Sequence, residues 1–265
     1  MRRPPQVSTL LIGATTFLLV QTSVVHSPFS FPSNWLQLGS PALAIPRYVP
    51  IQGRLPRRTQ GTGARGCMSD VTTTAQSSPT LTLLFGTDVE PTTLMHPVFF
   101  WHLSSASSMP VEFALIEPGQ AEPLFVKRFE TMSAGITSLA IPESTPALVP
   151  GRVYRWSVAL ICNSARRSSD IIAQAQIERL ERPSALAHQL ASATSNLERA
   201  EIYAQNGFWS DSMAVLKQAQ NAQPNNPVIV QDQLSLIEQI NLGEIAQQER
   251  QRLGLAATNT NSTSN

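Results

Sequence analysis

The chain has 265 residues, of which 42% are hydrophobic and only 14% are charged, and its formal net charge is +1. Such a nearly neutral chain lacks the concentrated basic surface of nucleic-acid-binding proteins, so we expect no nucleic-acid partner. Two cysteines are too few for a small disulfide scaffold, and the length allows one or two ordinary domains. The 20 prolines and the low charge favour an exported protein built mainly from β-strands.

Residues 1–44 have the features of a signal peptide. Arg2 and Arg3 precede an apolar stretch that is densest over the 11 residues 10–20. This length suits a signal peptide, whereas crossing a bilayer takes about 20 residues. Because Ala42-Leu43-Ala44 forms a small-x-small cleavage site, we expect a periplasmic or extracellular protein without a membrane span after processing. The alternative is membrane anchoring through an uncleaved segment 7–25.

Residues 45–66 form a basic segment between the signal peptide and the acidic remainder of the chain. From Arg47 to Gly66 there are five arginines and no acidic residue, whereas 12 basic and 18 acidic residues follow from Cys67 onward. The Gly- and Thr-rich composition cannot build a core, which predicts a disordered linker with solvated arginines. The alternative is an arm that docks on an anionic wall or membrane surface.

The two cysteines, Cys67 and Cys162, are 95 positions apart. In an exported protein two thiols usually pair, so we predict a disulfide that ties the start of the folded body to a late strand. A nucleophilic Cys162 is the weaker alternative, since no histidine lies near it in the sequence. The histidines show no zinc-type spacing with the cysteines, so no metal site is expected.

The region 67–182 is predicted to be one β-domain. Seven short β-prone runs are separated by turn-forming residues. They are Thr80–Phe85, Pro97–Leu103, Val111–Ile116, Leu124–Phe129, Ile136–Ile141, Val153–Ile161 and Ile171–Ile177. Their number and spacing predict a seven-strand antiparallel sandwich of the immunoglobulin or fibronectin type III kind.

A local motif supports the sandwich. The segment from Leu148 to Tyr154 reads Leu-x-Pro-Gly-x-x-Tyr, the form of a tyrosine corner in which the hydroxyl bonds to the backbone just upstream. In the following strand, alternation places Tyr154 and Trp156 on the same apolar face. Both residues are therefore expected to be structural.

The densest aromatic cluster is Phe99-Phe100-Trp101-His102. On a strand, Phe99 and Trp101 share one face, and His102 lies on the other. Burial of the aromatic side chains is the favoured interpretation, because large aromatic residues dominate protein cores. The alternative is a carbohydrate-binding surface in which exposed Phe99, Trp101 and His102 contact a sugar.

The region 183–253 is predicted to be helical, and the tail 254–265 is predicted to be disordered. After Pro183, apolar residues recur at alternating steps of four and three up to Ala204, which predicts one helix that ends at Asn206-Gly207. A second helix is expected from about Trp209 to Ala222 and a third from Val228 to Leu242.

The first two helices resemble a single tetratricopeptide repeat. The matching residues are Tyr203, Gly207, Trp209, Leu216, Ala219 and Pro224. A lone repeat cannot bury its own apolar face, so this hairpin must pack on the sandwich, on the third helix or on a partner. A helical cap over the sandwich is favoured over a peptide-binding groove, and Trp209 is expected to be structural.

A longer series of landmarks runs along the chain in a fixed order. They are Arg57-Arg58-Thr59, Cys67, His96 to Trp101, Val111 to Leu115, Tyr154 to Cys162, Arg167 to Asp170, Tyr203-Ala204, Gly207, Trp209 and Asp211. In this order they resemble the domain of unknown function family numbered 928, which is found chiefly in cyanobacteria. The resemblance covers roughly residues 57–242, and it implies kinship without an assigned activity.

No familiar catalytic motif is present in the sequence. There is no nucleophile elbow, zinc-protease motif, phosphate loop or dinucleotide glycine pattern. We therefore expect an exported, non-catalytic binding or adaptor module without a cofactor, whose partner is another envelope protein or wall polysaccharide. One alternative is a polysaccharide-binding module. A hydrolase of unknown substrate, with Glu112 and Asp170 as the only acidic pair worth testing, is the less favoured one.

Overall fold

The computed structural model describes residues 45–54, 67 and 79–255. All of them belong to one compact unit, residues 44–265. The predicted signal peptide 1–44, the segment 55–66 and the tail from residue 256 lie outside the described residues, so these predictions are not tested by the structure.

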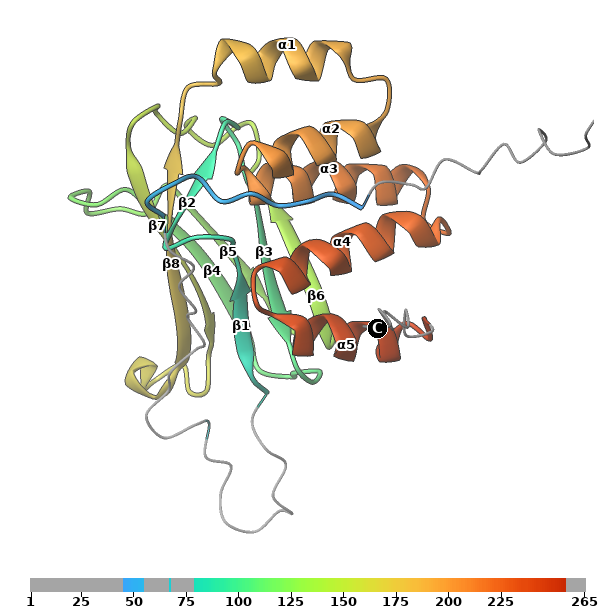
Figure 1. Cartoon of the computed structure of the whole chain (residues 1–265). Coiled ribbons are helices and arrows are strands. Elements are labelled where there is room, and N and C mark those ends of the chain that lie inside the picture. The colour runs from blue at the N-terminus through green and yellow to red at the C-terminus, as the bar shows by residue number, and fades with distance from the viewer. Residues whose placement is uncertain (1–44, 55–66, 68–78, 256–265) are drawn as a thin grey trace, which may run out of the picture. The chain divides into compact units, whose positions relative to one another are not determined.

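Eight strands form two sheets (Figure 1). Their bounds are β1 (Leu81–Leu84), β2 (Val89–Thr92), β3 (Val98–Leu103), β4 (Val111–Ile116), β5 (Phe125–Phe129), β6 (Gly135–Ala140), β7 (Val153–Leu160) and β8 (Ile171–Arg179). A three-stranded sheet has the order β1-β3-β6, and a five-stranded sheet has the order β2-β8-β7-β4-β5.

All seven predicted strands are present, but the prediction missed β2 and was wrong about a purely antiparallel arrangement. Strand β2 pairs with β8 in parallel, at the edge of the five-stranded sheet. It is four residues long and includes Glu90 and Pro91, so it lacks the alternation on which the prediction depended. Proline is tolerated there because an edge strand need not donate every backbone hydrogen bond.

The inner faces of the two sheets share one aromatic core. Phe99 of β3 lies with its ring centroid 5.0 Å from that of Phe113 on β4 and 4.9 Å from that of Trp156 on β7. Trp101, Tyr154 and Trp156 are buried in this core. The alternating burial of β4 and β8 follows from the period of two that a strand with one covered face requires.

Five helices follow the strands. They are α1 (Ser184–Ser192), α2 (Asn196–Gln205), α3 (Trp209–Ala222), α4 (Pro227–Gln239) and α5 (Gly243–Arg252). The single first helix predicted from Leu186 to Ala204 is wrong, because Ser195 begins a new helix by accepting a hydrogen bond from the backbone N–H of Glu198 at 3.1 Å. This Ser-x-x-Glu pattern is a capping box, which was readable in the sequence.

The third predicted helix is also too long. Helix α4 ends at Gln239, and Asn241 adopts a left-handed conformation with φ of 62° before α5 begins. Asparagine is one of the few non-glycine residues that adopt this conformation readily. Helix α5 was missed because its polar sequence carries a weak apolar period.

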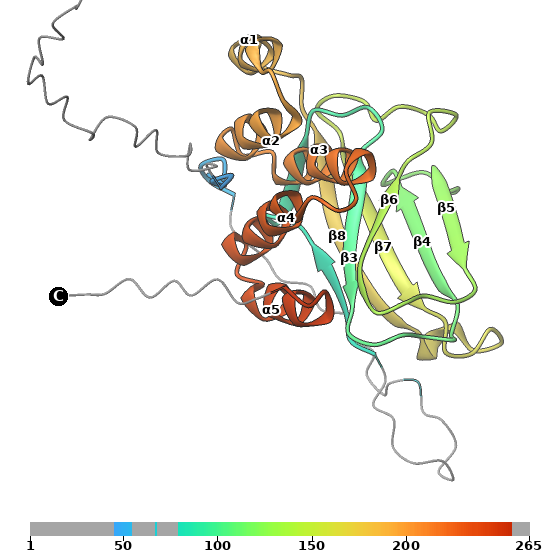
Figure 2. The same ribbon diagram turned by 90° about the vertical axis from the view of Figure 1, so that its right-hand side faces the viewer.

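The helices cover the outer face of the three-stranded sheet, and no helix of the described residues lies over the outer face of the five-stranded sheet (Figure 2). Leu84 of β1 and Phe100 of β3 pack into a second core with apolar residues of α2 to α5. Trp209 is fully buried there, and its indole N–H donates to the Leu236 carbonyl at 2.9 Å. The helical part is therefore a second layer on the sheet, as the favoured interpretation predicted.

The basic segment is ordered where the structure describes it, so the predicted disordered linker is wrong for residues 45–54, which we call the strap. Tyr48 is buried, and its backbone N–H donates to Gln239 Oε1 at 2.7 Å. The Val49 N–H donates to the Ala204 carbonyl at 3.0 Å, and Arg54 forms an ion pair with Glu178. An apolar anchor and an acidic partner hold the strap, neither of which its composition revealed.

Tyr154→Phe is expected to lower the free energy of unfolding by about 1 kcal/mol. The reason is the predicted tyrosine-corner bond, which is present: the Val149 N–H donates to the Tyr154 hydroxyl at 2.9 Å. Tyr48→Phe is the matched control, since the buried Tyr48 hydroxyl has no hydrogen-bond partner among the described residues. Urea unfolding of the two variants should show a loss for the first only, and equal losses would contradict the corner's role.

Candidate functional site

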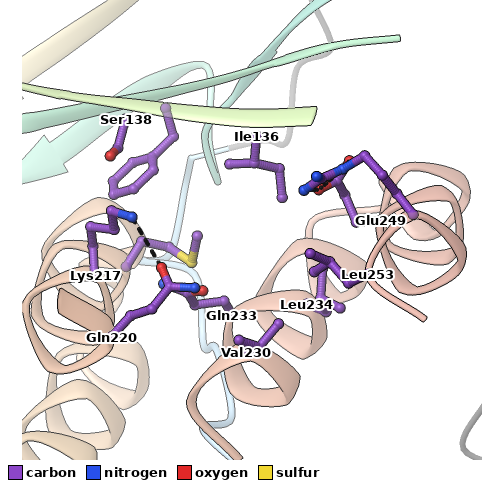
Figure 3. Close-up of a pocket in the computed structure, with 12 residues that line it drawn as sticks. Ile136, Ser138, Lys217, Gln220, Val230, Gln233, Leu234, Glu249 and Leu253 are labelled. Atoms are coloured by element: carbon purple, nitrogen blue, oxygen red, sulfur yellow. Dashed lines mark hydrogen bonds and ion pairs between the residues drawn. The ribbon is translucent and has the colours of Figure 1, made fainter. Parts of the chain in front are cut away.

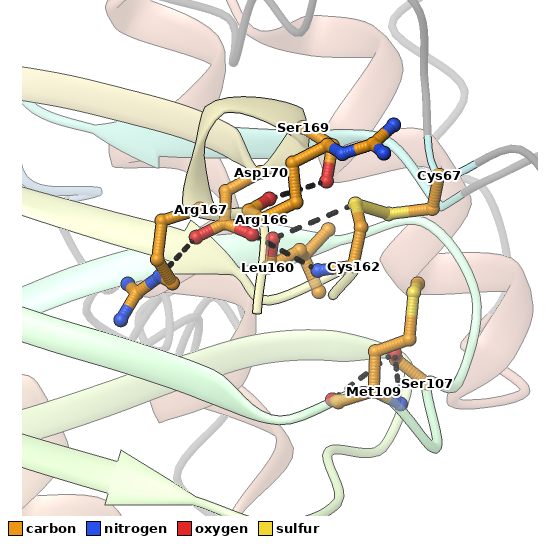
Figure 4. Close-up of a disulfide and its surroundings, with 9 residues drawn as sticks. All are labelled: Cys67, Ser107, Met109, Leu160, Cys162, Arg166, Arg167, Ser169 and Asp170. Carbon is orange, nitrogen blue, oxygen red and sulfur yellow. Dashed lines mark hydrogen bonds and ion pairs between the residues drawn. A yellow bond between two sulfur atoms is a disulfide. The ribbon is translucent and has the colours of Figure 1, made fainter. Parts of the chain in front are cut away.

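Three polar clusters in the described residues could carry function, and the first surrounds the disulfide. Cys67 and Cys162 are bridged, as predicted. The Cys162 N–H donates to Asp170 Oδ1 at 3.1 Å, and Arg167 donates from Nε to Asp170 Oδ2 at 2.5 Å (Figure 4). Arg167 also donates from Nη2 to Glu112 Oε1 at 2.8 Å.

This geometry bears directly on the acidic pair considered for a hydrolase. Glu112 and Asp170 are indeed brought to one place, but the same guanidinium binds both carboxylates. Those hydrogen bonds raise the pKa of Arg167, so the cation is retained. A general acid must carry a proton that it can release to a substrate. The arrangement is that of a braced turn beside the disulfide.

The aromatic cluster does not form an exposed surface, so the carbohydrate-stacking alternative is wrong for these residues. Phe99, Trp101 and His102 are 2%, 0% and 4% exposed. Phe99 and Trp101 lie in the core between the sheets, where the Trp101 indole N–H is 3.3 Å from the sulfur of Met132. His102 lies on the opposite face, as alternation requires, with Nε2 3.4 Å from Glu249 Oε1 of α5.

The second cluster joins β2 to the first turn of α3. Glu90 accepts backbone hydrogen bonds from Ser210 at 3.0 Å, Gly86 at 2.7 Å and Thr87 at 3.2 Å. Burial nevertheless raises the pKa of Glu90 to about 7. A carboxylate at a helix N-terminus compensates unpaired N–H groups and the helix dipole, which makes this junction a structural anchor.

Asp211 extends the same anchor. Its carboxylate accepts hydrogen bonds from the Thr92 hydroxyl at 2.5 Å, the Thr93 N–H at 2.8 Å and the Thr93 hydroxyl at 2.9 Å. Burial raises the pKa of Asp211 to about 6, in opposition to these bonds. The donors fill the carboxylate's acceptor sites on the protein side, so the cluster holds α3 against the sheet.

The third cluster lines a cavity of about 230 Å³ between the three-stranded sheet and the helices, which we call the interlayer pocket (Figure 3). Strands β3 and β6 form one wall, and helices α3, α4 and α5 form the other. Its lining residues are Phe100, Ile136, Ser138, Met213, Lys217, Gln220, Val230, Gln233, Leu234, Glu249, Arg252 and Leu253. Apolar walls with a few convergent polar groups are typical of small-molecule sites.

One end of the interlayer pocket holds a neutralised charge pair. Arg252 donates to both oxygens of Glu249, at 2.6 to 3.1 Å, and His102 contacts the same carboxylate. Burial opposes ionisation, yet the bonds from His102 and Arg252 hold the pKa of Glu249 at about 2. Glu249 is therefore ionised at neutral pH and satisfied by its own neighbours.

The other end holds Lys217 of α3. Its ammonium donates to the amide oxygen of Gln220 at 3.0 Å, and no carboxylate of the described residues lies within ion-pair distance. An ammonium has three donors, so this bond leaves two of them for another acceptor. Lys217 is thus the group in the pocket whose charge the described protein does not balance.

Sequence reasoning did not predict the pocket, although the aromatic cluster that it singled out includes Phe100, which lines the pocket, and His102, which contacts Glu249. Lys217, Gln220, Glu249 and Arg252 lie on α3 and α5, and both pairs have the three-residue spacing of side chains on one helix face. That spacing was the only available signal. The pocket itself depends on how α5 packs beside β6, which no local pattern specifies.

The residues that the structure describes contain no group of three or more histidine, cysteine or acidic side chains placed to hold a metal ion. Over the same residues, no helix is both long enough and apolar enough to cross a bilayer.

Comparison with known proteins identifies the family of the chain. No curated protein matches it. A family model described as Domain of Unknown Function (DUF928) matches residues 60–250, which include the disulfide, both sheets and nearly all of the helical layer. The match spans more than two thirds of the chain, and so the chain belongs to the DUF928 family.

Proposed function

We propose that this protein is an exported, non-catalytic binding or adaptor module of the cell envelope, and that the interlayer pocket is its ligand site. The observation that carries the proposal is the pocket, which combines apolar walls with a cation that lacks a carboxylate partner. Its cavity of about 230 Å³ lies below the range of about 300–1,000 Å³ that accommodates drug-sized molecules. It therefore suits a small ligand or a single inserted group.

Export to the periplasm or the extracellular space is supported by the bridge between Cys67 and Cys162, because such bonds persist in oxidising compartments. The predicted cleavage after Ala44 would also leave the whole strap attached, since its first packed contacts are made by Pro46 and Tyr48. Membrane anchoring through an uncleaved N-terminal segment is the alternative.

The proposed architecture is an immunoglobulin- or fibronectin-like sandwich with a tetratricopeptide-like hairpin of α2 and α3. The shared aromatic core and the tyrosine corner support the first part. The second is supported by the close approach of α2 to α3, where the Ser212 hydroxyl donates to the Ala200 carbonyl at 2.7 Å. The hairpin's apolar face is taken up by the sheet, so a larger envelope partner would have to contact other surfaces.

A binding role is favoured over catalysis because the acidic side chains at the three clusters are occupied. Glu112 and Asp170 share Arg167, Glu249 is paired with Arg252, and Glu90 and Asp211 accept hydrogen bonds from the backbone and threonines. Catalysis by a carboxylic acid or carboxylate needs at least one such group directed at substrate.

The test uses the methyl groups of methionine. In oxidised protein of residues 45–265, Met213 lines the interlayer pocket and Met132 lies in the core between the sheets. We expect small amphipathic compounds to shift the ¹³C-methyl NMR signal of Met213 and to leave Met132 unchanged, whereas oligosaccharides shift neither. A panel in which nothing shifts Met213 would reject the pocket as a ligand site.

A further inference from the structure

We propose that the interlayer pocket binds a small alkyl carboxylate, with the carboxylate on Lys217 and the alkyl chain along the apolar wall between α3, α4 and β6. This inference rests on the proposed function and adds the chemical class of the ligand. It follows from the order of the groups along the pocket, from their charges and from the size of the cavity.

The spatial order of polar and apolar side chains along the pocket matches that of the groups in an amphipathic molecule. Figure 3 shows Lys217 and Gln220 at one end and Glu249 at the other, with Ile136, Val230 and Leu234 between them. Burial of an alkyl chain against such a wall is favourable by about 25 cal/mol for each Å² removed from water. A ligand of this kind would place its polar group at one end and its chain in the middle.

The balance of charge selects an anion. Lys217 and Arg252 are the cations of the lining, and Glu249 is its one anion, so the lining has a formal excess of one positive charge. Arg252 is already engaged in a bidentate pair with Glu249. A carboxylate at Lys217 would supply the missing countercharge and accept the two free N–H donors through charge-assisted hydrogen bonds.

The same arrangement disfavours other ligands. An amine would face Lys217 with like charge, and the only anion of the lining, Glu249, is already neutralised. An alcohol could accept from Lys217 but would leave its charge unbalanced in a half-buried site. The small cavity excludes long acyl chains and sugar oligomers.

The chain offers an unusual chemical handle for the test. It has only two lysines, Lys127 and Lys217, against 17 arginines. Lys127 is exposed on β5, with its ammonium 6.0 Å from the centroid of the Phe129 ring. After cleavage at Ala44, an amine-reactive reagent can therefore modify only these two side chains and the new N-terminus.

The experiment measures acetylation rates by mass spectrometry with octanoate, octanol or octyltrimethylammonium present, the last being a cation that cannot itself be acetylated. Octanoate is expected to slow acetylation of Lys217 several-fold and to leave Lys127 unchanged. Lys217→Met keeps the apolar stem and is expected to weaken octanoate binding about tenfold, a factor that corresponds to about 1.4 kcal/mol. Lys127→Met is the control for the loss of a lysine at an exposed site, and Met213 methyl shifts measure binding in each variant.

The outcomes separate this inference from the proposed function. If octanol shifts Met213 as strongly as octanoate does, and Lys217→Met binds octanoate normally, the pocket binds ligands but the carboxylate assignment is wrong. If no probe shifts Met213, both are wrong. An unchanged Met132 signal and an unchanged urea-unfolding midpoint in ligand-free Lys217→Met would show that the variant is folded, so weaker binding can be assigned to the lost ammonium.

Discussion

Replacing both cysteines by serine is expected to lower the free energy of unfolding by about 4–5 kcal/mol. In the chain-entropy model, a bond that closes a loop near 100 residues lowers the conformational entropy of the unfolded chain. The free energy of the unfolded state rises by about 4–5 kcal/mol as a result. The bridge between Cys67 and Cys162 spans 95 positions and joins the chain ahead of β1 to the end of β7. This is a large fraction of the total stability of an ordinary domain, which is about 5–15 kcal/mol.

The measurement is urea unfolding of the oxidised protein, of the protein with a reductant, and of the double variant. The reduced protein and the variant should agree, because both lack the bond. Arg167→Ala is a useful comparison, since it removes the brace between Glu112 and Asp170 while the bridge remains. A double variant as stable as the oxidised protein would show that the bond contributes nothing to the fold.

The strands could be predicted because burial on one face leaves a period of two in the sequence. Strand β4 shows this directly, with Val111, Phe113 and Leu115 buried and the residues between them less so. Strand β2 could not be found in this way. Three of its four residues are buried, including Glu90, because it lies between β8 and α3 rather than at a solvated face.

The site was less predictable than the fold because its residues come together only through tertiary packing. Lys217 of α3 and Glu249 of α5 are far apart in the sequence, and α5 itself was missed. The strap shows the same limitation. Its composition indicates a solvated linker, yet burial of Tyr48 and pairing of Arg54 with Glu178 override that tendency. Composition indicates whether a segment can fold by itself, but it does not show which tertiary contacts the rest of the protein provides to that segment.

The protein is expected to be most stable near pH 4–5 and to lose stability as the pH rises to 8. Burial raises the pKa of Glu90 from 4.5 to about 7 and that of Asp211 from 3.8 to about 6, so the folded state binds protons more tightly than the unfolded state. Their stabilising contribution is complete below the unfolded pKa values and is lost as the pH passes the folded values. A tenfold change in proton affinity corresponds to about 1.4 kcal/mol, so each group contributes on the order of 3 kcal/mol.

The other charged groups near the junction of β2 and α3 do not reverse the loss of stability with rising pH. Asp211 raises the pKa of Glu90, and Arg182 lowers that of Asp211 by less than burial raises it. Burial also raises the pKa of Asp232 to about 6, which adds in the same direction. Glu249 acts oppositely, because its pKa of about 2 gives stability that is lost only in acid, below about pH 4.5.

The measurement is urea unfolding between pH 5 and 8. The quantity to compare is the slope of the free energy of unfolding against pH. Glu90→Gln should reduce the loss across this range by an amount on the order of 3 kcal/mol, even though the amide also weakens the junction at every pH by accepting fewer backbone N–H groups. Glu130→Gln is the matched control, since the Glu130 side chain is 74% exposed and should leave the slope unchanged. A wild-type stability that rises from pH 5 to 8 would mean that the backbone donors to Glu90 outweigh its burial, and that the carboxylate is ionised throughout the physiological range.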